Sequence, residues 1–192
     1  SLIKNLELNK VLPHVRKVKE VSSGTALITV DSSDNIITVV PGANACLDHS
    51  DIPEDIQAKD ILLSQLEISQ DIVRESFNRG RVIGATNILN LSPFTPIDND
   101  IIDLVDIMIV NKTELCLLCE LLGVNPNFEI LEDTLKQILS RKTFRAIIAT
   151  LGSEGVVLAG NESGIRFFKP QKIKVIDTTG AGDCFAGVLS GK

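Results

Sequence analysis

A glycine-rich segment near residue 180 ends in a carboxylate that could serve phosphoryl transfer. The segment reads Asp177-Thr178-Thr179-Gly180-Ala181-Gly182-Asp183 and lies between the apolar stretches 173–176 and 185–189. We expect a strand over 173–176 and a helix that begins near Asp183. Glycines let backbone approach a ligand closely, and a helix N-terminus offers unpaired N–H groups to a phosphate. Asp183 could then accept the proton of an attacking hydroxyl, although an ordinary turn with an Asp cap is the alternative.

Two other phosphate-binding patterns are excluded by the sequence. The chain contains no G-x-x-x-x-G-K-[ST] loop. It also lacks the G-x-G-x-x-G dinucleotide pattern here, because position 185 is Phe. The Gly180 segment therefore needs a different phosphate-binding context.

Polar residues also follow three apolar runs that we expect to be strands. They are found in Gln65-Leu66-Glu67, Asn111-Lys112-Thr113-Glu114 and Thr150-Leu151-Gly152-Ser153-Glu154-Gly155. In a doubly wound sheet, ligands collect beyond the carboxyl ends of the strands, where these residues would lie. The alternatives are a solvated neighbour of a helix N-cap at Glu67, a capping box or an ordinary solvated turn at Asn111–Glu114, and a plain β-turn at 150–155.

The rest of the sequence predicts the elements that would position these residues. Two β-branched runs around the turn-rich segment 31–34 predict a hairpin. Apolar runs without polar alternation are typical of parallel strands that helices cover on both faces, so we expect an α/β fold. The predicted strands are 25–30, 35–40, 61–66, 84–89, 105–110, 145–150, 156–159 and 165–168, and the predicted helices are 69–79, 113–122 and 130–141.

Composition excludes several classes of function. The 192 residues carry a net charge of −6 with a pI near 5.0, and aromatic residues make up 4% with no Trp or Tyr, which argues against nucleic-acid binding. No apolar run reaches the roughly 20 residues of a membrane-spanning helix, so we expect no membrane partner. The four cysteines, without a signal-peptide pattern, favour the cytoplasm.

The string D-T-T-G-A-G-D after a strand resembles the C-terminal signature of the ribokinase-like (PfkB) carbohydrate kinases. Asn111–Glu114 resembles the family's N-x-x-E motif, and Thr150–Gly155 resembles its T-L-G-x-x-G loop. The segments 24–30, 41–44 and 90–93 also look like the ribokinase branch, so the resemblance covers nearly the whole chain. It implies a three-layer α/β/α, doubly wound, mostly parallel sheet. Residues 1–45 would then belong to a small β-sheet lid and residues 46–192 to the ATP-binding domain.

The resemblance implies an ATP-dependent kinase that phosphorylates a sugar hydroxyl, with D-ribose giving D-ribose 5-phosphate as the favoured reaction. Asp183 would be the base, and Gly180, Ala181 and Gly182 would form the anion hole. Glu67 and Asp183 would bind the sugar. ATP would contact Asn111, Thr150, Leu151, Gly152, Ser153, Glu154, Gly155, Gly182 and Asp183. Glu114 would hold Mg²⁺ through water, Asp177 and Thr179 would hold K⁺, and a homodimer follows by family analogy.

The sequence departs from the family pattern in ways that leave other functions open. The Gly-Gly sugar motif and the C-terminal part of the nucleotide site are absent, and Asn90-Leu91-Ser92-Pro93 stands where the family commonly has Asn-Pro-Ala-Pro. Because the chain begins at Ser1 without Met and stops at Lys192 soon after a helix begins, we expect an inactive fragment of a longer enzyme. Fructose, adenosine or another nucleoside could be the acceptor. A non-catalytic ligand-binding or interaction module is the alternative to an enzyme.

Overall fold

The structure, a computed structural model, describes residues 2–30 and 35–191. The chain divides into two compact units, of which the smaller covers Ser1–Ile52 and the larger Pro53–Lys192. Every residue with a predicted catalytic or binding role lies in the larger unit. Within the described residues, no helix is long and apolar enough to cross a membrane.

The smaller unit contains the predicted hairpin. Its elements are α1 (Leu2–Leu8), β1 (Thr25–Val30), β2 (Asn35–Val40) and two 3-10 helices at Gly42–Cys46 and His49–Asp51. Strands β1 and β2 pair antiparallel with Thr25 opposite Val40, which confirms the prediction. The predicted turn 31–34 lies outside the described residues.

An arginine holds the segment before the hairpin against the segment after it. Arg16 donates from Nε and Nη2 to the two carboxylate oxygens of Asp51 at 2.7 and 2.6 Å, and Nη2 also donates to the Cys46 carbonyl. The Arg16 hydrogen bond lowers the pKa of Asp51 to about 2. Among the described side chains of this unit only Ile52 is buried. Backbone pairing and polar contacts therefore organise this unit more than an apolar core does.

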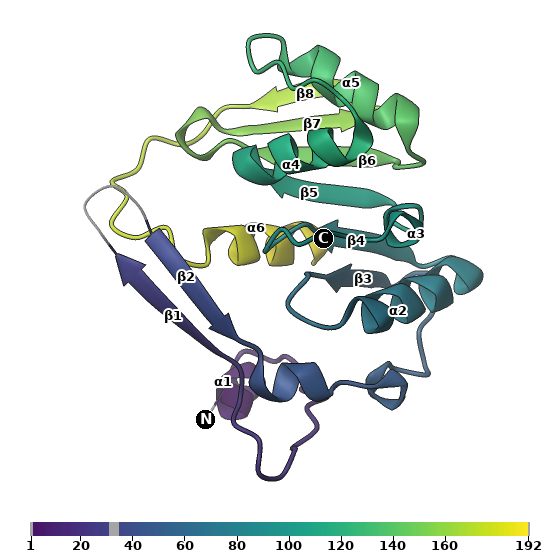
Figure 1. Cartoon of the computed structure of the whole chain (residues 1–192), viewed down its shortest axis with the longest axis vertical. Helices are drawn as coiled ribbons and strands as arrows, with labels where there is room; N and C mark the ends of the chain where they lie inside the picture. The colour runs from purple at the N-terminus through teal and green to yellow at the C-terminus, as the bar shows by residue number, and fades with distance from the viewer. Residues whose placement is uncertain (1, 31–34, 192) are drawn as a thin grey trace. The chain divides into compact units, whose positions relative to one another are not determined.

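The larger unit is built on a six-stranded sheet in the order β3-β4-β5-β6-β7-β8 (Figure 1). Its strands are β3 (Ile61–Ser64), β4 (Thr86–Asn90), β5 (Ile107–Asn111), β6 (Ala146–Thr150), β7 (Val156–Gly160) and β8 (Gly164–Phe168). Strands β3 to β6 are parallel, whereas β7 and β8 pair antiparallel. The mostly parallel α/β sheet predicted from the sequence is confirmed.

Helices cover both faces of this sheet. They are α2 (Gln70–Ile83), α3 (Asn99–Ile102), α4 (Lys112–Leu122), α5 (Leu131–Arg141) and α6 (Ala181–Ser190). On one face, Met108 of β5 packs in a large core with side chains of α2, α4 and α5. On the other face, Ile109 of β5 packs in a smaller cluster with Ala186 of α6. Successive strand residues point to opposite faces, so β5 serves both cores.

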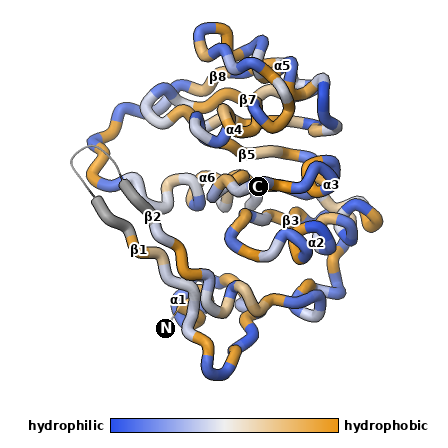
Figure 2. The backbone as a smooth tube through the Cα atoms, viewed as in Figure 1, coloured by the Kyte–Doolittle hydropathy of each residue, from blue (hydrophilic) through white to orange (hydrophobic). Residues whose placement is uncertain are grey.

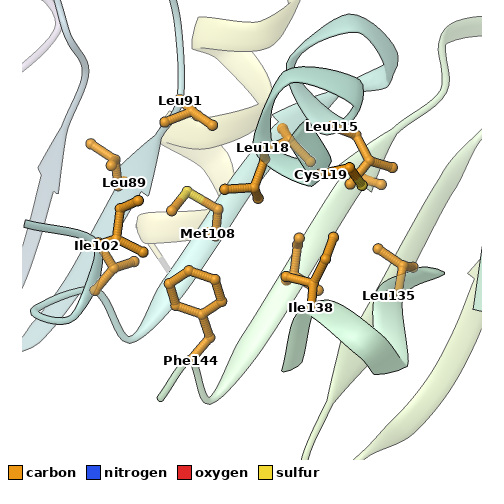
Figure 3. Close-up of a cluster of buried hydrophobic side chains, with 14 of the residues drawn as sticks. Leu89, Leu91, Ile102, Met108, Leu115, Leu118, Cys119, Leu135, Ile138 and Phe144 are labelled. Atoms are coloured by element: carbon orange, nitrogen blue, oxygen red, sulfur yellow. The ribbon is translucent and has the colours of Figure 1, made fainter. Parts of the chain in front are cut away.

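The larger core explains why the strands carry uninterrupted apolar runs. Figure 3 shows Leu89 and Met108 of the sheet beside Leu118 of α4 and Ile138 of α5, and all four side chains are buried. Hydrophobic residues are concentrated along these strands, whereas α2 and α5 mix hydrophobic with hydrophilic residues (Figure 2). This difference is expected when the strands are buried on two faces and the helices on one.

A buried asparagine sets how closely α2 approaches the sheet. Asn87 of β4 is fully buried, and its Nδ2 donates to the carbonyls of Phe77 and Leu104 at 2.8 and 2.9 Å. A Cβ atom on Gly80 of α2 would lie 2.3 Å from Asn87 Oδ1 and 2.6 Å from Leu62 Cδ1. Only glycine therefore fits at position 80 with the helix at this distance.

One predicted strand is absent. Residues 173–176 form no strand, and Ile173, Val175 and Ile176 are exposed. The prediction rested on their β-branched composition, but such side chains favour a strand only where a neighbouring strand and a packing surface receive them. In the described part of the chain the sheet ends at β3 and β8, and neither pairs with this segment. Helix α6 also begins at Ala181, slightly earlier than predicted.

We predict that Gly80→Ala lowers the free energy of unfolding by about 1–3 kcal/mol, the usual cost of overpacking. The matched control is Gly187→Ala in α6, where an added Cβ would meet nothing within 4 Å. Since alanine favours a helix over glycine, the control should be neutral or raise the free energy of unfolding by up to about 1 kcal/mol. Urea unfolding of both variants tests this, and equal effects would contradict the close approach of α2 to Asn87.

Candidate active site

The glycine segment forms a tight turn that leads directly into α6. The backbone N–H of Thr179 donates to Asp177 Oδ1 at 2.8 Å, and the N–H of Ala181 donates to the Thr178 carbonyl at 3.1 Å. Hydrogen bonds from the backbone and the side chain of Thr179 lower the pKa of Asp177 below its ordinary value. Gly180 precedes the helix with φ of +73°, a conformation that side chains other than glycine rarely adopt. The turn is therefore specified by its glycine and its first aspartate.

The start of α6 has the properties of an anion site. The N–H of Cys184 makes the first helical bond, to the carbonyl of Gly180 at 2.9 Å. The N–H groups of Gly182 and Asp183 precede it in the first turn and have no acceptor within the helix. Gly180, Ala181, Gly182 and Asp183 are all exposed, and an added Cβ on Gly182 would meet nothing within 4 Å. The end of the helix is thus accessible to a phosphate group.

Asp183 is contacted by a residue that the sequence did not assign to the site. Gln65 Nε2 donates to Asp183 Oδ1 at 2.6 Å. Gln65 directly follows β3, so the carboxylate of α6 meets the carboxyl end of a parallel strand. The only sequence signal was its position two residues before Glu67. Glu67 itself is exposed in the bend between β3 and α2.

Asn111 and Glu114 form a reciprocal capping box at the start of α4. The Asn111 side chain accepts the backbone N–H of Glu114 at 2.9 Å, and Glu114 Oε2 accepts the backbone N–H of Asn111 at 2.8 Å. Glu114 is buried, and this burial raises its pKa, while the hydrogen bonds from Asn111 and the Ser92 side chain act in the opposite direction. The capping box weighed as an alternative is therefore present, and nucleotide and metal roles for this pair stay predictions.

Thr150 lies next to Asn111 on the neighbouring strand. The two residues are register partners at the ends of β6 and β5, and Thr150 Oγ1 donates to the Val110 carbonyl at 3.3 Å. Beyond Thr150, the Leu151 N–H donates to the Gly155 carbonyl at 2.8 Å around a 3-10 turn at Gly152–Glu154. The predicted nucleotide loop thus begins beside the capping box.

An ion pair connects this loop to α4. Lys112 Nζ lies 3.4 Å from Glu154 Oε1 and 5.2 Å from the centre of the Phe128 ring. Both charged side chains are more than half exposed, so the pair adds little to stability. The pair links two of the predicted nucleotide-binding segments.

The residues of the candidate site therefore form two groups, and all of them except Gln65 were predicted from the sequence. Gln65 and Asp183 make one, and Asn111, Glu114 and Thr150 make the other. Both lie at the carboxyl edge of the parallel strands, where ligands of open α/β sheets bind. Within residues 2–30 and 35–191, no three His, Cys, Asp or Glu side chains gather in a way that could hold a metal ion.

The sequence pattern of the pfkB family carbohydrate kinases matches residues 1–191. The chain belongs to this family. Its relatives include the ribokinase of Lactococcus lactis, 34% identical over 99% of this chain and 60% of that protein, and the ribokinase of Dictyostelium discoideum, 32% identical over 90% and 60%. This chain therefore spans about three fifths of the length of these relatives.

Solved structures of ribokinases share the fold. Ribokinase from Thermotoga maritima superposes with a TM-score of 0.79 at 29% identity, over 99% of this chain and 63% of that one. Ribokinase from Cryptococcus neoformans, solved with ADP, gives 0.81 at 26% identity over 98% and 66%. Arabidopsis thaliana ribokinase, solved with ribose and ATP, gives 0.69 at 26% identity over 90% and 58%.

The raised pKa of Glu114 predicts a pH dependence of stability. Its ordinary value is 4.5, and a higher value in the folded chain means that folding favours the protonated form. The stabilisation is complete below the unfolded-state pKa and is lost as pH rises through the folded-state pKa. Glu114→Gln keeps an acceptor for the cap but does not titrate.

We therefore expect the free energy of unfolding of the Glu114→Gln variant, minus that of the unmodified chain, to increase as pH rises from about 4.5 towards neutrality. Urea unfolding at several pH values, without nucleotide or Mg²⁺, measures this difference. A difference that stays constant over the range would contradict the raised pKa.

Proposed function

We propose that this chain is part of an ATP-dependent sugar kinase that transfers the γ-phosphoryl group to a sugar hydroxyl. The observation that carries the proposal is the position of Asp183 in the first turn of α6. There, one carboxylate lies beside accessible backbone N–H groups. Such a turn can receive the transferred phosphoryl group and the attacking hydroxyl together. Membership of the pfkB carbohydrate kinases supports the same reaction.

In the proposed reaction, Asp183 accepts the proton of the acceptor hydroxyl while that oxygen attacks the γ-phosphorus. The bond from the γ-phosphorus to the β,γ-bridging oxygen breaks, and ADP leaves. The backbone N–H groups of Gly182 and Asp183 stabilise the negative charge on the transferred group, and the positive end of α6 adds to this effect. Gly180 and Ala181 shape the turn that presents them. Since phosphoryl transfer needs little covalent help from the protein, positioning and charge account for most of the rate.

The second group of residues is proposed to bind ATP. The side-chain amide of Asn111 keeps two N–H donors that can reach phosphate, since its oxygen is used in the cap. The turn 150–155 would bind the rest of the nucleotide through its backbone N–H groups and the Thr150 hydroxyl. ADP in the Cryptococcus ribokinase and ATP in the Arabidopsis ribokinase support a nucleotide partner.

D-Ribose is the acceptor that the relatives favour. Ribokinases from a bacterium and an amoeba match this chain at more than 30% identity, and the Arabidopsis ribokinase binds ribose together with ATP. Glu67, which follows β3 and is exposed, is proposed to contact a sugar hydroxyl.

The smaller unit, with its hairpin within residues 1–45, is proposed as the lid region and residues 46–192 as the ATP-binding domain. By analogy with the family, we also propose that the protein forms a homodimer and is cytoplasmic.

The residues fit Mg²⁺ only as an ion carried by ATP. Glu114 is a buried carboxylate in the nucleotide-binding group, and Mg²⁺ commonly keeps its waters between itself and such a carboxylate. When bound, Mg²⁺ would neutralise charge on the ATP phosphates. Asp177 and Thr179 offer hard oxygen atoms to K⁺ beside the anion site, and further oxygens would have to complete that shell.

We predict that Asp183→Asn lowers kcat by about 10²–10⁴-fold, the usual contribution of a general base. The assay follows ADP release by the full-length protein carrying this chain with ribose, fructose and adenosine, and ribose should give the highest kcat/KM. Asp133→Asn is the matched control, because Asp133 also lies in the first turn of a helix, α5, away from the site. Undiminished turnover by Asp183→Asn would exclude Asp183 as the base.

We also predict that K⁺ raises kcat of the full-length protein, because Asp177 and Thr179 offer oxygen atoms to a cation beside the phosphate-binding turn. Rates are compared in potassium chloride and tetramethylammonium chloride at equal ionic strength. Asp177→Asn should reduce the response to K⁺. Equal rates in the two salts would exclude a monovalent-cation site.

A further inference from the structure

Asp183 differs from two other carboxylates that occupy the same position in their helices. Glu114 is the third residue of α4 and accepts the backbone N–H of its N-cap residue, and Asp51 does the same in its 3-10 helix. Asp183 is the third residue of α6, but its Oδ1 accepts from Gln65 of another element. In a capping box, a carboxylate at this position accepts the backbone N–H of its own N-cap residue. Asp183 instead uses Oδ1 to accept a hydrogen bond from a residue that directly follows β3.

Hydrogen bonds made by the residues before and after Gln65 hold its backbone in place. The Ser64 hydroxyl donates to the Gln65 carbonyl at 3.1 Å. The N–H of the next residue, Leu66, donates to the Ser92 carbonyl at 3.0 Å, and the Leu66 side chain is buried in the main core. The Gln65 side chain thus extends from backbone that is anchored to the sheet. A donor on such a support can set the orientation of the group it contacts.

We infer that Gln65 is a positioning residue for the proposed base, a role that rests on the proposed kinase function. Its amide occupies Asp183 Oδ1, so Oδ2 is the oxygen that faces the acceptor hydroxyl. The amide is always a donor at Nε2 and carries no charge, so it fixes the carboxylate without competing with it for the proton. Gln65 does not itself touch the reacting atoms in this scheme.

The substitution that tests this role is Gln65→Met, which keeps the length of the side chain and removes the donor. We expect kcat for ribose phosphorylation by the full-length protein to fall by about 10–100-fold, since small misplacement of a catalytic group has effects of this size. KM for ATP should not change, because the nucleotide residues lie on β5, α4 and the 150–155 turn. Gln137→Met, at an exposed position of α5, is the matched control and should retain the unmodified kcat.

A double-mutant cycle separates positioning from a general structural effect. If Gln65 acts through Asp183, Gln65→Met should cause no further loss of kcat when Asp183 is already Asn, because the two residues act as one unit. An equal loss of kcat in both backgrounds would overturn the inference, and so would an unmodified kcat in Gln65→Met. Thermal unfolding of each variant shows whether any loss arises from instability.

A second measurement detects the contact between Gln65 and Asp183 without an activity assay. In ¹⁵N-labelled protein, Asp183→Asn should shift the side-chain amide signals of Gln65 and leave those of Gln137 in place. Unmoved Gln65 signals would overturn the contact. Unmodified protein that binds no ATP and phosphorylates no acceptor would instead overturn the proposed kinase function, and the catalytic role of Gln65 with it.

Discussion

The packing of α6 against the sheet is the contact on which the candidate site depends. Ala186 is buried between Ile88 of β4 and Ile109 of β5. Its small side chain allows the helix to lie close to the strands. Asp183 lies three residues earlier, so the two side chains share one side of the helix. The apolar contact at Ala186 thus directs Asp183 towards the strand ends, where Gln65 receives it.

The parts of the site that are local in sequence could be predicted from it. The apolar runs of β5 and β6 and the polar residues after them identify Asn111 and Thr150, and parallel pairing makes these two residues neighbours. The contact between Gln65 and Asp183 joins residues 118 positions apart, and no local pattern signals which face of β3 meets α6. The error at 173–176 has the related cause that strand composition does not specify a pairing partner.

The Asn111–Glu114 pair shows that a structural explanation and a functional one need not compete. The cap uses the oxygen of the Asn111 side chain and Oε2 of Glu114. It leaves the amide N–H groups of Asn111 as donors for an anion. The same hydrogen bonds fix both side chains at the edge of the sheet. These side chains would therefore lose little conformational entropy on binding a ligand. Sequence alone could not separate these readings, because one spacing satisfies both.

The electrostatics of the site require cations if it is to bind ATP. Asp177, Asp183 and Glu114 place carboxylates near the proposed phosphate positions, and the nearby Lys112 is paired with Glu154. The start of α6 supplies roughly half a positive charge, whereas a triphosphate carries several negative charges. Backbone N–H groups can orient such a ligand but cannot neutralise it beside these carboxylates. Metal ions bound with the nucleotide would supply the missing positive charge, and Glu114 and Asp177 are the carboxylates proposed to hold them.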